Sequence, residues 1–206
     1  MNEADLIRRR TAALAPSYQL FYDDPVHLVR GSGVWLFDAD GNRYLDCYNN
    51  VPSVGHAHPR IVEALATQTG LLNTHTRYLH EHVVELAERL GDSLPGDLGT
   101  CYFVCTGTEA NDLAVQIARV VTGHHGVMVT ERSYHGNSDL VGKLSTDSYP
   151  ASERPEWLAV AEPPNTYRGP LRVPEAELGA QYAALVDDAL DALSERGHEV
   201  AAMLID

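Results

Sequence analysis

The sequence predicts an α/β fold in which helices cover a mostly parallel β-sheet. The first observation is that short apolar runs alternate with stretches of helical periodicity through the second half of the chain. The second is the segment 101–122, where five β-branched, aromatic or sulfur-bearing residues lead through Thr106-Gly107-Thr108 into a helical pattern. Gly123 then follows as a helix stop. The segment therefore predicts a buried strand, a tight turn and a helix in succession.

The other expected elements follow from periodicity, turn residues and breakers. In the first half we expect a helix over 3–14, a hairpin with strands 34–37 and 44–47, and helices over 59–72 and 80–90. In the second half we expect strands over 127–130, 158–161 and 200–205, a helix over 175–196 and a loop over 137–157. Pro59 suits the first position of a helix. We place an N-terminal segment at 1–58 and an incomplete large domain at 59–206.

Composition excludes several classes of partner. The 206 residues include 44% hydrophobic and 21% charged side chains, as in a globular protein. The net charge of −14 argues against nucleic acid or an anionic membrane as the main partner. No apolar run has the length of a membrane span, and residues 1–15 lack a signal-peptide core. Cys47, Cys101 and Cys105 cannot all pair in one chain, which favours a reducing cytoplasm.

The turn at Thr106-Gly107-Thr108 has two interpretations. A helix N-terminus offers unpaired N–H groups and the positive end of the helix dipole, so small residues there let a phosphate approach. Alternatively, Thr106 or Thr108 only caps the helix. Both interpretations stay open on the turn alone, because short motifs match often by chance.

Metal and nucleotide motifs are absent or incomplete. His56 and His58 lie two residues apart, but no further ligands stand at metal-site spacing. The string at 80–84 has Val84 where a zinc protease needs its second histidine. No GxGxxG follows a strand and no GxxxxGK[ST] is present. We therefore expect no metal site and no nucleotide-binding motif of these kinds.

Four motifs in order and spacing resemble those of class III (subgroup II) aminotransferases, which are fold-type-I pyridoxal phosphate enzymes. The motifs include GSGVWLFDADGNRYLDCYNNVPSVGHAHP from Gly31, TGTEAND from Thr106 and SYHG from Ser133. The resemblance extends from Gly31 to Asp206. Details such as Tyr48-Asn49-Asn50 are most similar to the branch that holds ethanolamine-phosphate phospho-lyases and alanine–glyoxylate-type aminotransferases.

The resemblance assigns site residues. It implies that the N–H groups of Gly107 and Thr108 bind the phosphate and that the ring of Tyr134 stacks on the pyridine ring. The full set implied for the cofactor is Thr106, Gly107, Thr108, Glu109, Tyr134, His135 and Asp206. The set implied for the substrate side is Tyr48, Asn50 and Arg77.

No catalytic residue is expected in this chain. Its one lysine, Lys143, stands on a polar stretch where the family does not place its Schiff-base lysine. The pyridine-pairing aspartate and the Schiff-base lysine of the family lie beyond Asp206. Without that lysine the covalent anchor and the general base are missing. We therefore expect the N-terminal half of a larger enzyme, truncated and inactive alone.

The resemblance implies transfer of an amino group between an amine or amino acid and a 2-oxo acid. It also implies a homodimer with the active site at the interface. Three alternatives remain: a phospho-lyase acting on a phosphorylated amine, a non-catalytic homologue that binds pyridoxal phosphate, and an unrelated α/β domain that binds another phosphate.

Overall fold

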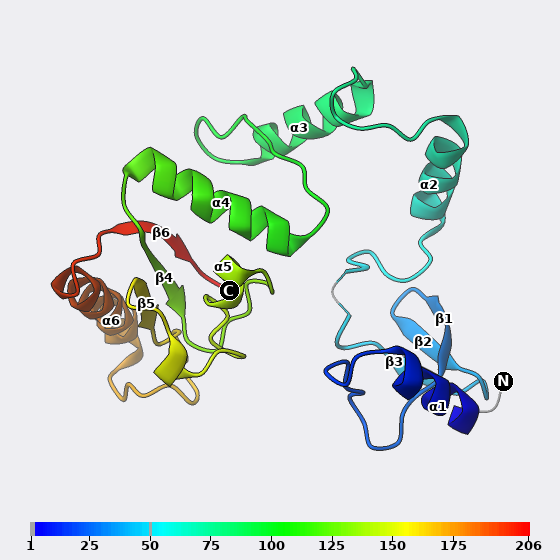
Figure 1. Cartoon of the computed structure of the whole chain (residues 1–206), viewed down its shortest axis with the longest axis horizontal. Coiled ribbons are helices and arrows are strands. Elements are labelled where there is room, and N and C mark those ends of the chain that lie inside the picture. The colour runs from blue at the N-terminus through cyan, green and yellow to red at the C-terminus, as the bar shows by residue number, and fades with distance from the viewer. Residues whose placement is uncertain (1–2, 50) are drawn as a thin grey trace. The chain divides into compact units, whose positions relative to one another are not determined.

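The computed structural model describes residues 3–49 and 51–206 and divides into two compact units, Met1–Glu81 and His82–Asp206 (Figure 1). Each unit is described by itself. The expected boundary between residues 58 and 59 stays a prediction.

The first unit contains a small antiparallel sheet. One helix precedes the sheet along the chain and another follows it. Helix α1 spans Glu3–Ala13 and α2 spans Pro59–Leu71, with Pro59 at its start as predicted. The sheet has the order β1-β2-β3, from Leu28–Ser32, Trp35–Asp38 and Arg43–Leu45. Strands β2 and β3 confirm the predicted hairpin. Strand β1 was not predicted, because its sequence LVRGS does not alternate between apolar and polar residues.

The second unit confirms the predicted parallel sheet. Its strand order is β5-β4-β6, from Leu158–Ala161, Gly126–Thr130 and Val200–Leu204, and both pairings are parallel. Helix α3 spans Glu81–Ser93, α4 Gly107–Thr122, α5 Asp139–Gly142 and α6 Glu175–Glu195. A short 3-10 helix, η1, covers Ala151–Glu153. Strands therefore alternate with helices along the chain, as expected for an α/β fold.

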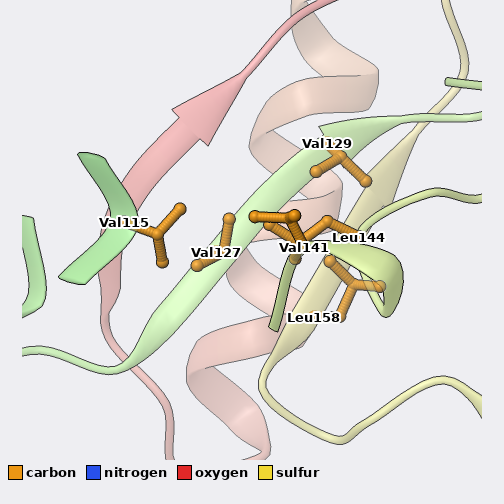
Figure 2. Packing of buried hydrophobic residues seen from close by; sticks show 6 residues of the cluster. All are labelled: Val115, Val127, Val129, Val141, Leu144 and Leu158. Carbon is orange, nitrogen blue, oxygen red and sulfur yellow. The ribbon is translucent and has the colours of Figure 1, made fainter. Parts of the chain in front are cut away.

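The core lies on both faces of the central strand β4. On one face Val127 and Val129 pack with Val115 of α4 and with Val141, Leu144 and Leu158 (Figure 2). On the other face Met128 packs with Ala159, Ala161 and Leu193 of α6. Successive side chains of a strand point to opposite faces, so α4 and α5 cover one face and α6 covers the other. All five residues of β4 are buried, which is typical of a central parallel strand.

Two sequence predictions in this unit are wrong. Residues 101–105 form no strand, and Tyr102 is 72% exposed. The composition favours a strand, but a strand also needs a neighbour for its backbone groups, and no described segment pairs with this one. The stretch 137–157 is not wholly a loop, because α5 forms where Ser138 caps it by accepting the Val141 N–H at 3.3 Å. Within the described residues, no helix has both the length and the apolar character needed to cross a bilayer.

Candidate functional site

Three segments of the second unit meet at one edge of its sheet. Strands β4 and β6 are parallel neighbours, so the residues that follow Thr130 and Leu204 leave the sheet at the same edge. The last turn of helix α4 leads into the start of β4. The first turn of α4 therefore lies near the opposite end of β4, at the edge where β4 and β6 end. Ligands of open α/β sheets bind at the carboxyl ends of the strands.

The first turn of α4 is capped by two side chains of the Thr-Gly-Thr motif and its neighbour. Thr106 has extended backbone angles, and its hydroxyl oxygen accepts the Glu109 N–H at 3.1 Å. The Glu109 carboxylate accepts the Cys105 N–H at 2.7 Å. The capping interpretation of Thr106 is therefore confirmed, and Gly123 ends the helix in a left-handed conformation with φ 71°.

Two backbone donors of this turn are left available. Among residues 3–49 and 51–206, no acceptor bonds to the N–H groups of Gly107 and Thr108. These groups stand at the positive end of the helix dipole. The first turn of α4 can therefore bind an anion. The side chains of Thr106 and Glu109 stabilise this turn without occupying the N–H groups of Gly107 and Thr108.

The turn after β4 lies directly against this helix start. A methyl group added to Gly136 would lie 2.7 Å from Oγ1 of Thr108 and 2.8 Å from Cγ2 of Val141. Gly136 also has a φ of 135°, which side chains rarely permit. Thr108 donates from its hydroxyl to Oδ1 of Asn137 at 3.3 Å. Glycine is thus required where the SYHG and Thr-Gly-Thr motifs touch.

Tyr134 and Asp206 are joined across the same edge. The Tyr134 N–H donates to Oδ2 of Asp206 at 3.2 Å. Tyr134 is 55% exposed, so it does not pack as a core tyrosine in this structure. Its backbone is therefore held by the end of β6, while its ring remains free to stack on a flat ligand.

His135 is the buried member of the turn. It is 6% exposed, its N–H donates to Oγ of Ser145 at 2.9 Å, and its carbonyl oxygen accepts from Nδ2 of Asn111 at 2.9 Å. Burial lowers its pKa, although the charges of Asp206 and Asp147 oppose this shift. Within the described part of the chain, its Nε2 atom has no partner. His135 therefore packs as a neutral ring that fixes the turn.

Ser133 and Thr146 form a second set of polar contacts where the turn leaves β4. The Ser133 N–H donates to Oγ1 of Thr146 at 3.0 Å, and both hydroxyls donate to the Thr130 carbonyl oxygen, at 2.7 and 3.0 Å. Both side chains are buried. These bonds satisfy the polar groups where the chain leaves β4 and so rigidify the site.

Lys143 lines a pocket of about 320 Å³ beside Tyr134 but is already paired. Its ammonium group donates to Asp139 at 2.9 Å, and this hydrogen bond raises the pKa of Lys143. A lysine that forms a covalent bond to a carbonyl needs its neutral amine. Lys143 therefore has a carboxylate partner in this structure, and the expectation that it is not the Schiff-base lysine stays a prediction.

The residues expected on the substrate side belong to the first unit. Tyr48 is 72% exposed and meets the ring of Phe21 edge-to-face, with centroids 4.9 Å apart. Arg77 is exposed in a turn where its N–H donates to Nδ1 of His75 at 3.2 Å. Asn50 lies outside the described residues. Their placement at the active site stays a prediction.

Sequence reasoning did not identify three residues that shape the site: Asn111, Asn137 and Ser145. Asn111 stands inside the TGTEAND string and Asn137 directly follows SYHG, so their proximity to the motifs was a usable signal. Ser145 carried no signal, because its contacts with the turn come from the return of the chain after α5. Among residues 3–49 and 51–206, no group of three or more His, Cys, Asp or Glu side chains could hold a metal ion.

Comparisons with known proteins show to which family the chain belongs. A family model described as aminotransferase class-III matches residues 19–206. The chain is 37% identical to the Drosophila melanogaster protein "Alanine--glyoxylate aminotransferase 2-like" over 99% of this chain and 43% of that protein. It is 35% identical to the Caenorhabditis elegans "Ethanolamine-phosphate phospho-lyase homolog 1" over 98% of this chain and 46% of that protein.

Solved structures agree. An Arthrobacter phospholyase in complex with phosphoethanolamine is 41% identical, with a TM-score of 0.86 over 98% of this chain and 48% of that one. An (S)-enantioselective omega-transaminase from Thermomicrobium roseum is 28% identical, with a TM-score of 0.75 over 98% of this chain and 49% of that one.

The chain belongs to the class III aminotransferase family, whose members use pyridoxal phosphate, and its fold is that of the fold-type-I transaminases. It spans a little under half the length of the Drosophila, Caenorhabditis and Arthrobacter relatives.

Proposed function

We propose that this chain is part of a pyridoxal phosphate enzyme that moves an amino group between an amine or amino acid and a 2-oxo acid. The observation that carries the proposal is the meeting of three features at one sheet edge: the free N–H groups of α4, the exposed ring of Tyr134 and the Asp206 carboxylate. Phosphate, aromatic ring and polar ring substituents are the parts of the cofactor that these groups match.

The chain's own residues would hold the cofactor as follows. Gly107 and Thr108 would donate their N–H groups to the phosphate, and the Thr108 hydroxyl would turn from Asn137 to add a bond. Tyr134 would stack on the ring, because Asp206 and His135 fix the backbone on either side of it. When bound, pyridoxal phosphate supplies a ring that withdraws electrons from the substrate carbon next to nitrogen.

We further propose that these 206 residues are inactive alone. The one lysine, Lys143, is paired with Asp139 and stands where the family does not place its Schiff-base lysine, so no described side chain among these residues takes that role. The whole enzyme would act as a homodimer in the cytoplasm, with Tyr48, Asn50 and Arg77 on the substrate side. The three free cysteines agree with a reducing compartment.

A phospho-lyase acting on a phosphorylated amine is the second candidate. It is favoured by the 41% identity and TM-score of 0.86 to the Arthrobacter phospholyase, both higher than the values for the omega-transaminase from Thermomicrobium roseum. Incubating the natural gene product with phosphoethanolamine distinguishes the two. Release of inorganic phosphate indicates the lyase, whereas transfer of the amino group to an added 2-oxo acid indicates the transferase.

Titration of the 206-residue chain with pyridoxal phosphate, followed by cofactor absorbance, tests the cofactor site. Thr108→Ala should weaken binding by about 1–2 kcal/mol, the loss of one charge-assisted hydrogen bond. The matched control is Thr122→Ala at the far end of α4, where the hydroxyl donates to the Ala118 carbonyl oxygen and accepts the His124 N–H.

Identical titration curves for Thr108→Ala and the unchanged chain would contradict the assignment. Tighter binding of inorganic phosphate than of pyridoxal phosphate would favour an unrelated anion site. A natural gene product that binds the cofactor, but forms no covalent adduct on borohydride reduction and shows neither activity, would be a non-catalytic homologue.

A further inference from the structure

The loop between Asp46 and His56 in the first unit is closed at its base by backbone bonds. Asp46 donates its N–H to the Val34 carbonyl oxygen at 2.9 Å as the chain leaves β3. His56 then forms an antiparallel bridge with Gly33, through two hydrogen bonds of 2.8 and 3.0 Å. The loop therefore leaves and returns at adjacent residues of the turn between β1 and β2.

The two residues at this base also bond through their side chains. Nε2 of His56 lies 2.7 Å from Oδ2 of Asp46, and the side chains are 21% and 6% exposed. An ionised carboxylate can only accept, so Nε2 carries the hydrogen and donates it. A charge-assisted bond of this kind, largely shielded from water, is shorter and stronger than a neutral one.

The other carboxylate oxygen of Asp46 holds the backbone of the loop. Oδ1 accepts from the N–H groups of Tyr48 at 3.1 Å and Asn49 at 2.9 Å, and from Nδ2 of Asn49 at 3.1 Å. The Asn49 N–H first, and then the His56 bond, lower the pKa of Asp46 well below its usual value. One carboxylate thus connects the base of the loop to the turn that carries Tyr48.

Steric limits leave His56 little freedom. A methyl group at Gly31 would lie 2.6 Å from Cβ of His56. One at Gly55, whose φ is 91°, would lie 2.9 Å from Cα of Gly33. Two glycines are therefore required for the imidazole to sit against the strand and reach Asp46.

We infer that Asp46 and His56 are positioning residues, which together hold the Tyr48-Asn49 turn and so fix the exposed Tyr48 ring, which the family resemblance assigns to the substrate side. Tyr48 is 72% exposed, and its ring contact among residues 3–49 and 51–206 is the edge-to-face one with Phe21, so the turn depends mainly on Asp46. The part of this inference that concerns substrate rests on the proposed function. The part that concerns the loop does not.

Amide hydrogen exchange of the 206-residue chain, measured by NMR, tests the loop. Asp46→Ala should raise the exchange rates of the Tyr48 and Asn49 amides at least tenfold and weaken the Overhauser contact between Phe21 and Tyr48. Asp46→Asn keeps an acceptor oxygen and should raise them less than threefold. The matched control is Asp38→Ala, which removes a carboxylate that accepts the Asp40 and Asn42 N–H groups in the neighbouring hairpin.

Substitutions of His56 separate positioning from folding. His56→Ala should free the Tyr48 turn as Asp46→Ala does, while His56→Gln, which keeps a donor, should restore most of the protection. The β2–β3 amides should keep their protection in the two Asp46 variants and the two His56 variants. Unchanged Tyr48 exchange in both alanine variants would overturn the inference.

A binding measurement then connects the loop to substrate. In the natural gene product, Asp46→Ala and His56→Ala should leave the dissociation constant for pyridoxal phosphate unchanged, and should weaken the binding of phosphoethanolamine to the loaded enzyme about tenfold. Unchanged phosphoethanolamine binding would overturn the positioning role. If the natural gene product binds no pyridoxal phosphate, the proposed function fails, and the exchange rates alone still decide whether Asp46 and His56 hold the turn.

Discussion

The N–H of Tyr134 donates to the carboxylate of Asp206 at 3.2 Å, although the two residues are 72 positions apart in the sequence. One residue belongs to the turn after β4 and the other follows β6, so the bond ties two neighbouring strands together at the edge where a ligand can bind. The acceptor of this bond is a carboxylate, and the donor belongs to the residue directly before the buried His135.

Removing this carboxylate should loosen the turn. Asp206→Ala deletes the acceptor of the Tyr134 N–H, and the lost bond corresponds to about 1 kcal/mol. We expect faster amide exchange at Tyr134 and weaker binding of pyridoxal phosphate. Asp206→Asn keeps an acceptor oxygen and serves as the control. Equal exchange rates in the alanine variant and the unchanged chain would show that the bond does not hold the turn.

Gly136 should not tolerate a side chain. Gly136→Ala would place a methyl group 2.7 Å from Oγ1 of Thr108 at a φ of 135°, and we expect a loss of about 1–3 kcal/mol in the free energy of unfolding. Denaturant titration measures this loss. Gly142→Ala is the matched control, because its methyl group would have 3.8 Å to its nearest neighbour. Similar stability of the two variants would refute the close approach.

Thr106 and Thr108 should separate into a capping role and a ligand role. Thr106→Ala removes the cap of α4 and should lower the free energy of unfolding by about 1 kcal/mol. Thr106→Ser keeps the hydroxyl and should restore it. Thr108→Ala should change stability less than cofactor affinity. Thermal unfolding and cofactor titration of the same three proteins distinguish the roles, and a stable Thr106→Ala variant would argue against the cap.

Acid should destabilise the fold through His135. Burial lowers the pKa of this histidine, so the unfolded chain takes up a proton at higher pH than the folded chain does. The free energy of unfolding should therefore fall as the pH drops below about 6.5. Unfolding midpoints of the unchanged chain and His135→Asn, compared from pH 7.5 to 5, give the measurement. A parallel pH dependence in both proteins would exclude His135 as the source.

The residues around α4 were predicted from the sequence because their structure depends on near neighbours. Helical periodicity, the Thr106 cap and the Gly123 stop act within a few residues of each other. The same holds for the hairpin between β2 and β3, which an Asp-Gly turn predicts. Strand β1 lacked a local pattern and became apparent only through its pairing with β2.

Contacts between distant segments could not be predicted in the same way. Segment 101–105 has a strand composition but no strand, because hydrogen bonding to a neighbour decides whether an extended segment joins a sheet. The reach of Asn111 to His135 and of Thr108 to Asn137 likewise depends on how the chain returns after β4. Family resemblance named Tyr134 and Asp206, but it did not indicate that they bond to one another.

By itself, the sequence determined the α/β class and the capped helix start, because propensity, periodicity and turn chemistry are local, and its resemblance to the family indicated the two motifs that we propose for the cofactor site. Tertiary structure alone decided which atoms meet: Gly136 against Thr108, Tyr134 against Asp206, and His56 against Asp46. Each of these meetings depends on strand register and loop closure across ten or more residues. Such placements are set by the packing of the whole unit and not by any short stretch of the chain.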